Sequence, residues 1–166
     1  MSYLPNKLIA GWAPTTITVL HTKTRKKKLM MDTTTRPLDA QLVHIATMLA
    51  VSDLARSLAF YRDHFGFEVR DQAEHIVLLA RDTMLLYLVI ESPPTPDKPD
   101  ITLAAPTTPG RTPVCLVLRV TDCQAAYTEL SARGVIFMTP PRTPPWGGQR
   151  CFAQDPDGYL VELEQP

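Results

Sequence analysis

Two stretches of the chain repeat one pattern: Val51-Ser-Asp-Leu-Ala-Arg-Ser-Leu-Ala-Phe-Tyr-Arg-Asp-His-Phe-Gly66 and Val120-Thr-Asp-Cys-Gln-Ala-Ala-Tyr-Thr-Glu-Leu-Ser-Ala-Arg-Gly134. Each stretch follows a strand-like run that ends in valine. Each then meets an aspartate, continues with apolar residues at helical spacing and stops at a glycine. Because an internal repeat of this kind defines one supersecondary unit per copy, the sequence predicts two similar modules in tandem.

The first copy predicts a βαβββ module over residues 41–92. Residues 43–51 alternate between bulky and smaller side chains, so we expect a strand whose odd-numbered residues face the helix. Asp53 should cap the helix, because its carboxylate can accept backbone N–H groups, and Gly66 should end it. Three more strands are expected at 67–70, 75–80 and 84–90.

The second copy predicts the same order over residues 113–166. A strand at 114–120 precedes Asp122, the expected helix cap, and Gly134, the expected helix end. The stretch Asp155-Pro-Asp-Gly158 is a turn signal between the last two strands. The remaining strands are expected at 135–139, 149–154 and 159–164.

Two segments lie outside the repeat. Residues 93–112 hold six of the sixteen prolines, which indicates a linker between the modules. Residues 1–40 carry seven Lys or Arg against two Asp, with most of the positive charge at 23–28. A nucleic-acid or membrane-surface tail is one interpretation of this cluster, but we favour a solvated, disordered leader. Met30 and Met31 directly follow the cluster and are alternative start positions.

Composition limits the function classes. With 166 residues, 45% of them hydrophobic, the chain is long enough for one domain with a core. Residues 41–166 hold ten basic and fifteen acidic side chains, a net charge of −5, so we expect no nucleic-acid partner. No run approaches the ~20 apolar residues of a membrane span. The three cysteines, Cys115, Cys123 and Cys151, lack metal-type spacing and favour a cytoplasmic location.

Several short motifs together resemble a known family. They are Val51-Ser-Asp-Leu54, Phe60-Tyr-Arg-Asp63, Gly66-Phe67, Trp146-Gly-Gly-Gln-Arg-Cys-Phe152, Asp155-Pro-Asp-Gly158 and Glu162-Leu163. Their order resembles the vicinal oxygen chelate superfamily of glyoxalase, bleomycin-resistance protein and extradiol dioxygenase, and is closest to the metal-free bleomycin-resistance-like members. The resemblance implies an α+β fold in which two tandem βαβββ modules form a curled mixed sheet around a cavity, within a homodimer.

The resemblance also implies where metal ligands would stand. In this sequence those positions are Ala46, Tyr87, Cys115 and Glu162. A catalytic divalent ion typically needs about three protein ligands, which this set does not supply, so we expect no metal. His44 shares a strand face with Ala46 but lies two residues earlier, about 6.6 Å along the strand, too far to replace it without a bulge.

The two polar members of this set have ordinary interpretations too. Glu162 alternates with Glu164, as on a solvated edge, whereas the resemblance places it in the cavity. A buried Glu162 would need a cation, and Arg119 and Arg150 are the candidates. Cys115 is more often a small buried hydrophobe than a nucleophile, because no activating base can be named for it.

A proline-rich loop carries a tryptophan. Pro140-Pro-Arg-Thr-Pro-Pro-Trp146 precedes the seventh strand, and the side chains of Arg150 and Phe152 alternate onto one face of that strand. From the residues alone, Trp146 is equally a core plug or a cavity wall. The resemblance favours a wall, because metal-free members use aromatics to hold flat ligands.

Three functions remain as hypotheses. The first is a metal-free small-molecule binder that sequesters a planar antibiotic or metabolite, using Trp146, Arg150, Phe152, Glu162, Cys115 and Tyr87. The second is a metal-dependent glyoxalase-like lyase or dioxygenase, using His44 or Cys115 with Glu162. The third is a non-catalytic accessory module with a packed cavity. No catalytic residue can be assigned.

Overall fold

The computed structural model describes residues 42–108 and 111–166, which hold both predicted modules. The expected leader at 1–40 lies outside the described residues. Among the described residues, no helix has the length and apolar character needed to cross a membrane.

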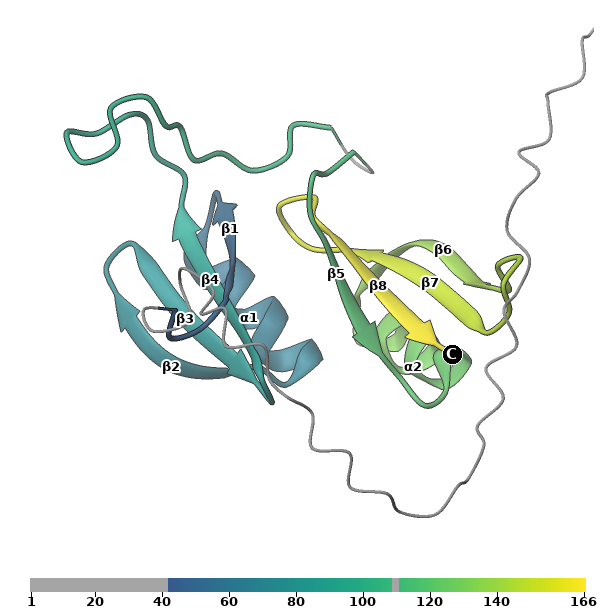
Figure 1. Ribbon diagram of the computed structural model, residues 1–166. Helices are drawn as coiled ribbons and strands as arrows, with labels where there is room; N and C mark the ends of the chain where they lie inside the picture. The colour runs from purple at the N-terminus through teal and green to yellow at the C-terminus, as the bar shows by residue number, and fades with distance from the viewer. Residues whose placement is uncertain (1–41, 109–110) are drawn as a thin grey trace, which may run out of the picture. The chain divides into compact units, whose positions relative to one another are not determined.

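The first module contains one helix and one four-stranded mixed sheet (Figure 1). The strands lie in the order β1-β4-β3-β2, with β1 parallel to β4 and the other neighbours antiparallel. Its elements are β1 (Thr47–Val51), α1 (Leu54–Phe65), β2 (Glu68–Ala73), β3 (Ile76–Arg81) and β4 (Met84–Ile90).

The second module repeats this topology with the order β5-β8-β7-β6, β5 being parallel to β8. The α+β class and the two similar modules are therefore as predicted, and the strands form two separate four-stranded mixed sheets. Each sheet is open, with four strands and two edges. The elements of the second module are β5 (Cys115–Arg119), α2 (Cys123–Ala132), β6 (Ile136–Arg142), β7 (Gln149–Gln154) and β8 (Leu160–Gln165).

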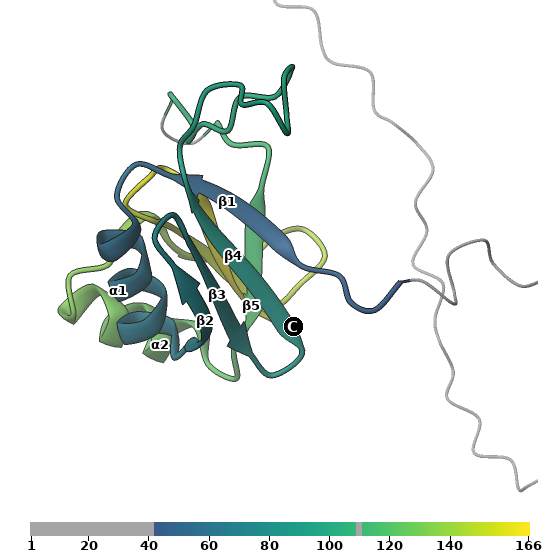
Figure 2. The same cartoon turned by 90° about the vertical axis from the view of Figure 1, so that its left-hand side faces the viewer.

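The helix boundaries follow from the predicted caps. The Asp53 carboxylate accepts from the backbone N–H of Arg56 at 2.9 Å, and the Asp122 carboxylate accepts from that of Ala125 at 2.8 Å. Gly66 ends α1 in the left-handed region, with φ 66°, where a residue without Cβ is favoured. Each helix packs against one face of its own sheet, as Figures 1 and 2 show.

The first strand is shorter than predicted. It begins at Thr47, so the side chains of Val43 and Ile45 are 90% and 79% exposed instead of facing the helix. The register explains part of the difference. Thr47 pairs with Leu86 in the parallel ladder, so Val43 would fall opposite the β3–β4 turn at Asp82, where there is no strand to pair with. Ile45 would fall opposite Met84, the first residue of β4, and the register does not account for its exposure. Leu49 and Val51 are fully buried against the helix side, as expected.

Strand β6 is longer than predicted. It runs through Pro140 and Pro141 to Arg142, although the sequence indicated a loop from Pro140. Proline removes a backbone donor but is tolerated on an edge strand, and β6 is the outer strand of its sheet. The pairing with β7 is irregular in two places, between Phe137 and Thr139 and between Thr139 and Arg142.

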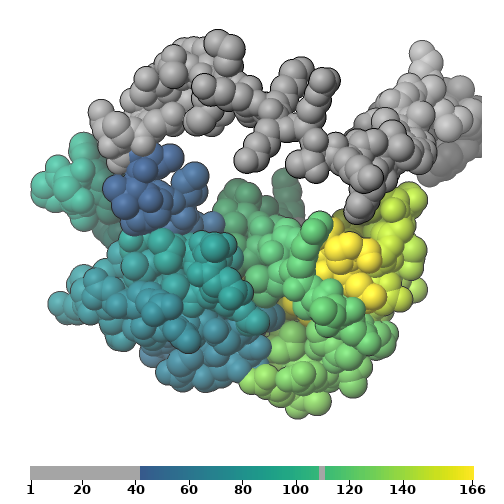
Figure 3. Space-filling model, turned by 60° about the horizontal axis from the view of Figure 1, so that its bottom comes forward, coloured from purple at the N-terminus to yellow at the C-terminus, as the bar shows by residue number. Residues whose placement is uncertain are grey.

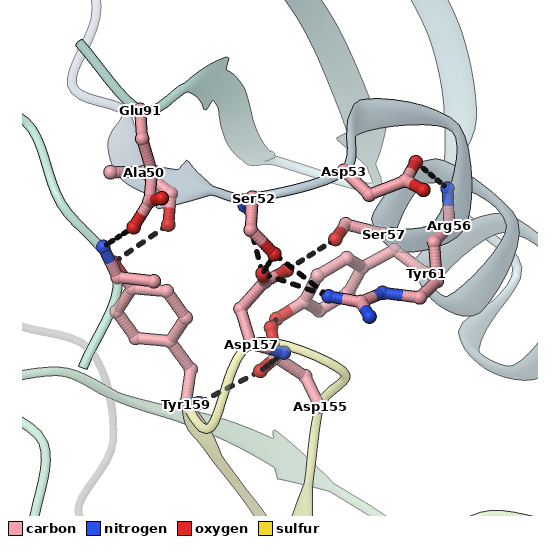
Figure 4. A network of polar contacts seen from close by, with 11 residues as sticks. Ala50, Ser52, Asp53, Arg56, Ser57, Tyr61, Glu91, Asp155, Asp157 and Tyr159 are labelled. Carbon is pink, nitrogen blue, oxygen red and sulfur yellow. Dashed lines mark hydrogen bonds and ion pairs between the residues drawn. The ribbon is translucent and has the colours of Figure 1, made fainter. Parts of the chain in front are cut away.

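A buried polar network joins the two modules (Figure 4). One Asp157 carboxylate oxygen accepts from the hydroxyl of Ser52 at 2.6 Å, and the other accepts from that of Ser57 at 2.5 Å. The Arg56 guanidinium donates to the same carboxylate at 3.1 Å. The predicted Asp155–Gly158 turn of the second module therefore reaches the start of α1 in the first. In Figure 3 the surface of the first module, in blue and teal, meets the green surface of the second.

Candidate functional site

Strands β5, β7 and β8 carry polar and aromatic side chains on the face turned away from α2. On the opposite face, Leu116, Cys151, Val161 and Leu163 are buried toward the helix. Because side chains alternate along a strand, their neighbours in sequence form the other face. We call this the helix-free face of the second sheet, and it carries Cys115, Val117, Arg119, Arg150, Phe152, Leu160, Glu162 and Glu164.

Arg150 connects the charged and aromatic side chains of this face. Its guanidinium donates to the Glu162 carboxylate at 3.5 Å. The same guanidinium lies over the Trp146 ring, 4.8 Å from its centroid, and 5.3 Å from the centroid of Phe152. A cation held near two aromatic rings is stabilised by their quadrupoles. Arg150 thus links the aromatic loop, the aromatic strand residue and the carboxylate into one cluster.

Glu162 and Glu164 use different arginines. The sequence left Arg119 and Arg150 open as partners of Glu162, and the structure selects Arg150. Arg119 instead donates to Glu164 at 3.1 Å. The Glu162 side chain is 14% exposed, which favours holding it in an ion pair over leaving it uncompensated.

The Trp146 side chain is 68% exposed and is not a core plug. It lines a hollow of about 270 Å³ together with Arg119, Arg150 and Glu164. The loop needs glycine at Gly148, where φ is 72° and an added Cβ would clash with the Gln165 carbonyl oxygen. The proline and glycine residues of this loop therefore present the indole at the surface beside the charged strands.

Cys115 lies on the helix-free face, and the other two cysteines do not. Burial and the neighbouring Glu162 carboxylate raise the pKa of the Cys115 thiol, which disfavours the nucleophilic thiolate. Cys123 and Cys151 are buried on the helix side with their sulfurs 3.6 Å apart. Sequence spacing did not indicate this contact, because 28 positions separate the two residues. Burial and Cys123 raise the pKa of Cys151 to about 12.

Tyr87 lies on the sheet of the first module, apart from the other predicted site residues. Met48 pairs with Tyr87 in the first sheet and Val117 pairs with Glu162 in the second. Met48 and Val117 each stand five residues before a helix cap, so Tyr87 and Glu162 occupy corresponding positions in the two modules. The other five predicted residues share one face or its bordering loop.

The implied metal-ligand positions do not fit a metal. Ala46 precedes β1, and His44 lies in the exposed segment before it. Cys115 and Glu162 are close enough for the carboxylate to affect the thiol, but together they supply two donors. Within residues 42–108 and 111–166, no three His, Cys, Asp or Glu side chains are grouped to hold an ion. No step of any reaction can be derived through a metal here.

A second hollow, of about 450 Å³, lies at the junction of the modules. Its lining combines apolar side chains from the α1 end, β5 and α2 with the charged side chains of Arg81, Asp82, Arg119 and Glu129. One of these, Arg81, donates to the Phe65 carbonyl oxygen. Since the hollow contains none of the aromatic stacking around Arg150, the smaller hollow beside Trp146 is the better candidate site.

The sequence match identifies the family. The model of the Glyoxalase/Bleomycin resistance protein/Dioxygenase superfamily matches residues 41–163, which span both modules. The chain belongs to this superfamily. Among curated proteins, none matches the chain significantly.

Solved structures agree on the fold. A glyoxalase-related enzyme from Fulvimarina pelagi is 25% identical, with a TM-score of 0.58 over 75% of this chain and 89% of its own. A superfamily member from Sphaerobacter thermophilus is 26% identical, with a TM-score of 0.55 over 74% of this chain and 96% of its own. Lactoylglutathione lyase from Agrobacterium tumefaciens is 22% identical, with a TM-score of 0.59 over 74% of this chain and 93% of its own, a likeness of fold alone.

Proposed function

We propose that this chain is a metal-free small-molecule-binding protein of the bleomycin-resistance type, which holds a planar ligand on the helix-free face of its second sheet. The observation that carries the proposal is the stack of Arg150 on Trp146 beside the hollow of about 270 Å³. Ligand sites commonly combine aromatic walls with a few placed charged groups, and this face has both.

The residues at the four implied metal-ligand positions support ligand binding over metal catalysis. Two of the four implied ligand positions hold alanine and tyrosine, and the Cys115 thiol has a raised pKa. A metal-dependent lyase or dioxygenase is the alternative, and the closeness of Cys115 to Glu162 is the observation in its favour. Metal analysis of the dialysed protein separates the two functions. One tightly held Zn, Fe, Mn or Ni per chain, lost in Glu162→Gln, would establish the alternative.

We also propose that the functional unit is a homodimer. In the described part of the chain, β1 and β5 each have a strand partner on one side only. Open sheet edges are usually paired or covered, and a twofold dimer is the commonest way to do so. Light scattering at micromolar concentration should give twice the mass of the chain, and a monomer would contradict the proposal.

A thermal-shift screen with aromatic antibiotics and metabolites tests the binding function. A ligand at 100 times its Kd stabilises the folded protein by about 2.7 kcal/mol, a readily measured shift. For any ligand found, Trp146→Ala should weaken binding about tenfold, equivalent to ~1.4 kcal/mol, and Trp146→Phe should weaken it less, because a ring remains to stack.

Stability supplies the control for these variants. Since Trp146 is largely exposed, Trp146→Ala should leave the melting temperature of the free protein nearly unchanged. A variant that melts several degrees lower but binds as tightly as the parent would reject Trp146 as a ligand-contacting residue. In a Trp12→Phe background Trp146 is the only tryptophan, so its emission should change when the ligand binds.

A further inference from the structure

We propose that this site selects planar ligands that carry a negative charge, such as aromatic carboxylates. The inference rests on the proposed small-molecule function and names the chemical class of its ligand. It is carried by the distribution of charge across the second sheet.

One row of side chains crosses the sheet at its charged end. By register, Arg119 pairs with Glu164, Glu164 with Arg150, and Arg150 with Arg142. Residues paired in this way project from the same face of the sheet. The row thus holds three guanidinium groups and one carboxylate, and Glu162 lies next to it on the same face.

The row and Glu162 together have an excess of one positive charge. Arg119 is paired with Glu164, and Arg150 with Glu162. Three arginines against two glutamates leave a net charge of +1. Arg142, an exposed residue, makes no ion pair with the described residues.

Arg142 is the register partner of Arg150 at the end of the β6–β7 pair, after the irregularity between Thr139 and Arg142. Like charges in such positions destabilise a sheet unless something neutralises them. Glu162 pairs with Arg150 and Glu164 with Arg119, and among the described residues neither glutamate forms an ion pair with Arg142. A bound anion near Arg142 and Arg150 would remove the repulsion. A guanidinium can bind a carboxylate through two parallel hydrogen bonds, which makes arginine well suited to this ligand.

The exposed Trp146 indole adds a preference for a planar ligand. The hollow beside Trp146 measures about 270 Å³, which is roughly nine times the ~30 Å³ that one water molecule occupies in the liquid. It is therefore large enough for a small ring system. Trp146 is exposed, so one ring face can stack on the indole while an acidic group lies toward the arginines.

Three probes of nearly equal size and different charge test the inference on the full chain. They are 2-naphthoate, the neutral 2-naphthamide and 2-naphthylmethylammonium, with binding measured by calorimetry at pH 7. We expect the naphthoate to bind tightest and the ammonium weakest. Raising NaCl from 50 to 500 mM should weaken naphthoate binding and leave naphthamide binding unchanged, because salt screens exposed charges.

Arg142→Gln is the informative variant, because the described structure gives this side chain no partner to lose. It should weaken naphthoate binding by about five- to tenfold, as expected for one charge-assisted contact, with no change for naphthamide. Arg70→Gln is the matched control. It removes an exposed arginine from β2 of the first module and should leave all three affinities unchanged.

The outcomes separate this inference from the proposed function. If the three probes bind equally well and Trp146→Ala weakens all of them, the small-molecule site stands and its anion selectivity is overturned. If Arg142→Gln weakens naphthoate binding while Trp146→Ala does not, the charged row acts without the aromatic wall and the inference is also wrong. If naphthoate does not bind at millimolar concentration the inference fails, while the proposed function is still decided by the screen.

Discussion

Tyr61 donates a hydrogen bond of 2.7 Å to the carboxylate of Asp155, which ties helix α1 of the first module to the turn between β7 and β8 of the second. Burial and the Asp155 charge raise the pKa of the Tyr61 hydroxyl well above its ordinary value, so the hydroxyl stays protonated and remains a donor. Asp155 also accepts from the backbone N–H groups of Asp157 and Tyr159. Asp155 thus orders its own turn and joins it to α1 through Tyr61, beside the contacts of Asp157 with the start of that helix (Figure 4).

Replacing Tyr61 with phenylalanine should destabilise the fold by about 1–3 kcal/mol, because it leaves a buried carboxylate without its side-chain donor. Urea unfolding gives the free energy of unfolding directly. Tyr127→Phe is the control. Tyr127, on α2, packs its ring against Phe137 of β6, and its hydroxyl has no partner among the described contacts. Equal losses for the two variants would show that the hydrogen bond across the modules contributes little.

Asp157 should make the fold sensitive to acid. Burial acts to raise the pKa of Asp157. Hydrogen bonds from Ser52 and Ser57, together with the positive charge of Arg56, outweigh this effect and hold the pKa below its usual value. A lowered folded-state pKa contributes stability above the unfolded pKa of about 3.9, and this contribution is lost as the pH falls through the folded value. The contribution of Asp157 to stability should therefore decrease as the pH falls below about 4.

The Asp157→Asn variant isolates this contribution. It should be less stable than the parent by about 1–3 kcal/mol at pH 7, because the hydroxyl donors lose a charged acceptor. The difference should shrink as the pH is lowered toward 3. Asp100→Asn, in the exposed linker, should follow the parent throughout. Parallel curves of stability against pH for Asp157→Asn and the parent would contradict the assignment.

Only one of the three thiols should react readily with a water-soluble disulfide reagent in the folded protein. Cys115 is exposed, whereas Cys123 and Cys151 are fully buried and should react after unfolding. Glu162→Gln should speed the reaction of Cys115 by roughly twofold or more at pH 8, because it removes a negative charge that raises the thiol pKa. Glu164→Gln, on the same strand, should not. Rapid loss of all three thiols would disprove the burial of the pair.

A chain that begins at Met31 should fold and dimerise like the full chain. The residues of the described hydrophobic core lie between Leu49 and Leu163, and the family match begins at residue 41. Circular dichroism melting and light scattering of the two chains measure this. A melting temperature several degrees lower for the shortened chain would show that residues 1–30 stabilise the domain.

Local features of the sequence determined the secondary structure well. Asp53, Asp122 and Gly66 define helix boundaries through backbone chemistry that involves only neighbouring residues. Alternation indicates which face of each strand is buried, so Leu49 and Val51 were assigned to the helix side correctly. The first strand was placed too early because the alternation continues through residues 43–46, whereas pairing with β4 begins only at Thr47.

In the candidate site, too, the sequence determined some features and the tertiary structure decided others. The sequence by itself determined the repeat, the family and the side chains that share a strand face, because these follow from residue order and from the period of two along a strand. Only the tertiary structure decided which groups meet: Glu162 with Arg150, Arg119 with Glu164, and Cys123 with Cys151. Each of these contacts depends on strand order, register or helix packing, and these are set by the cooperative burial of the whole core.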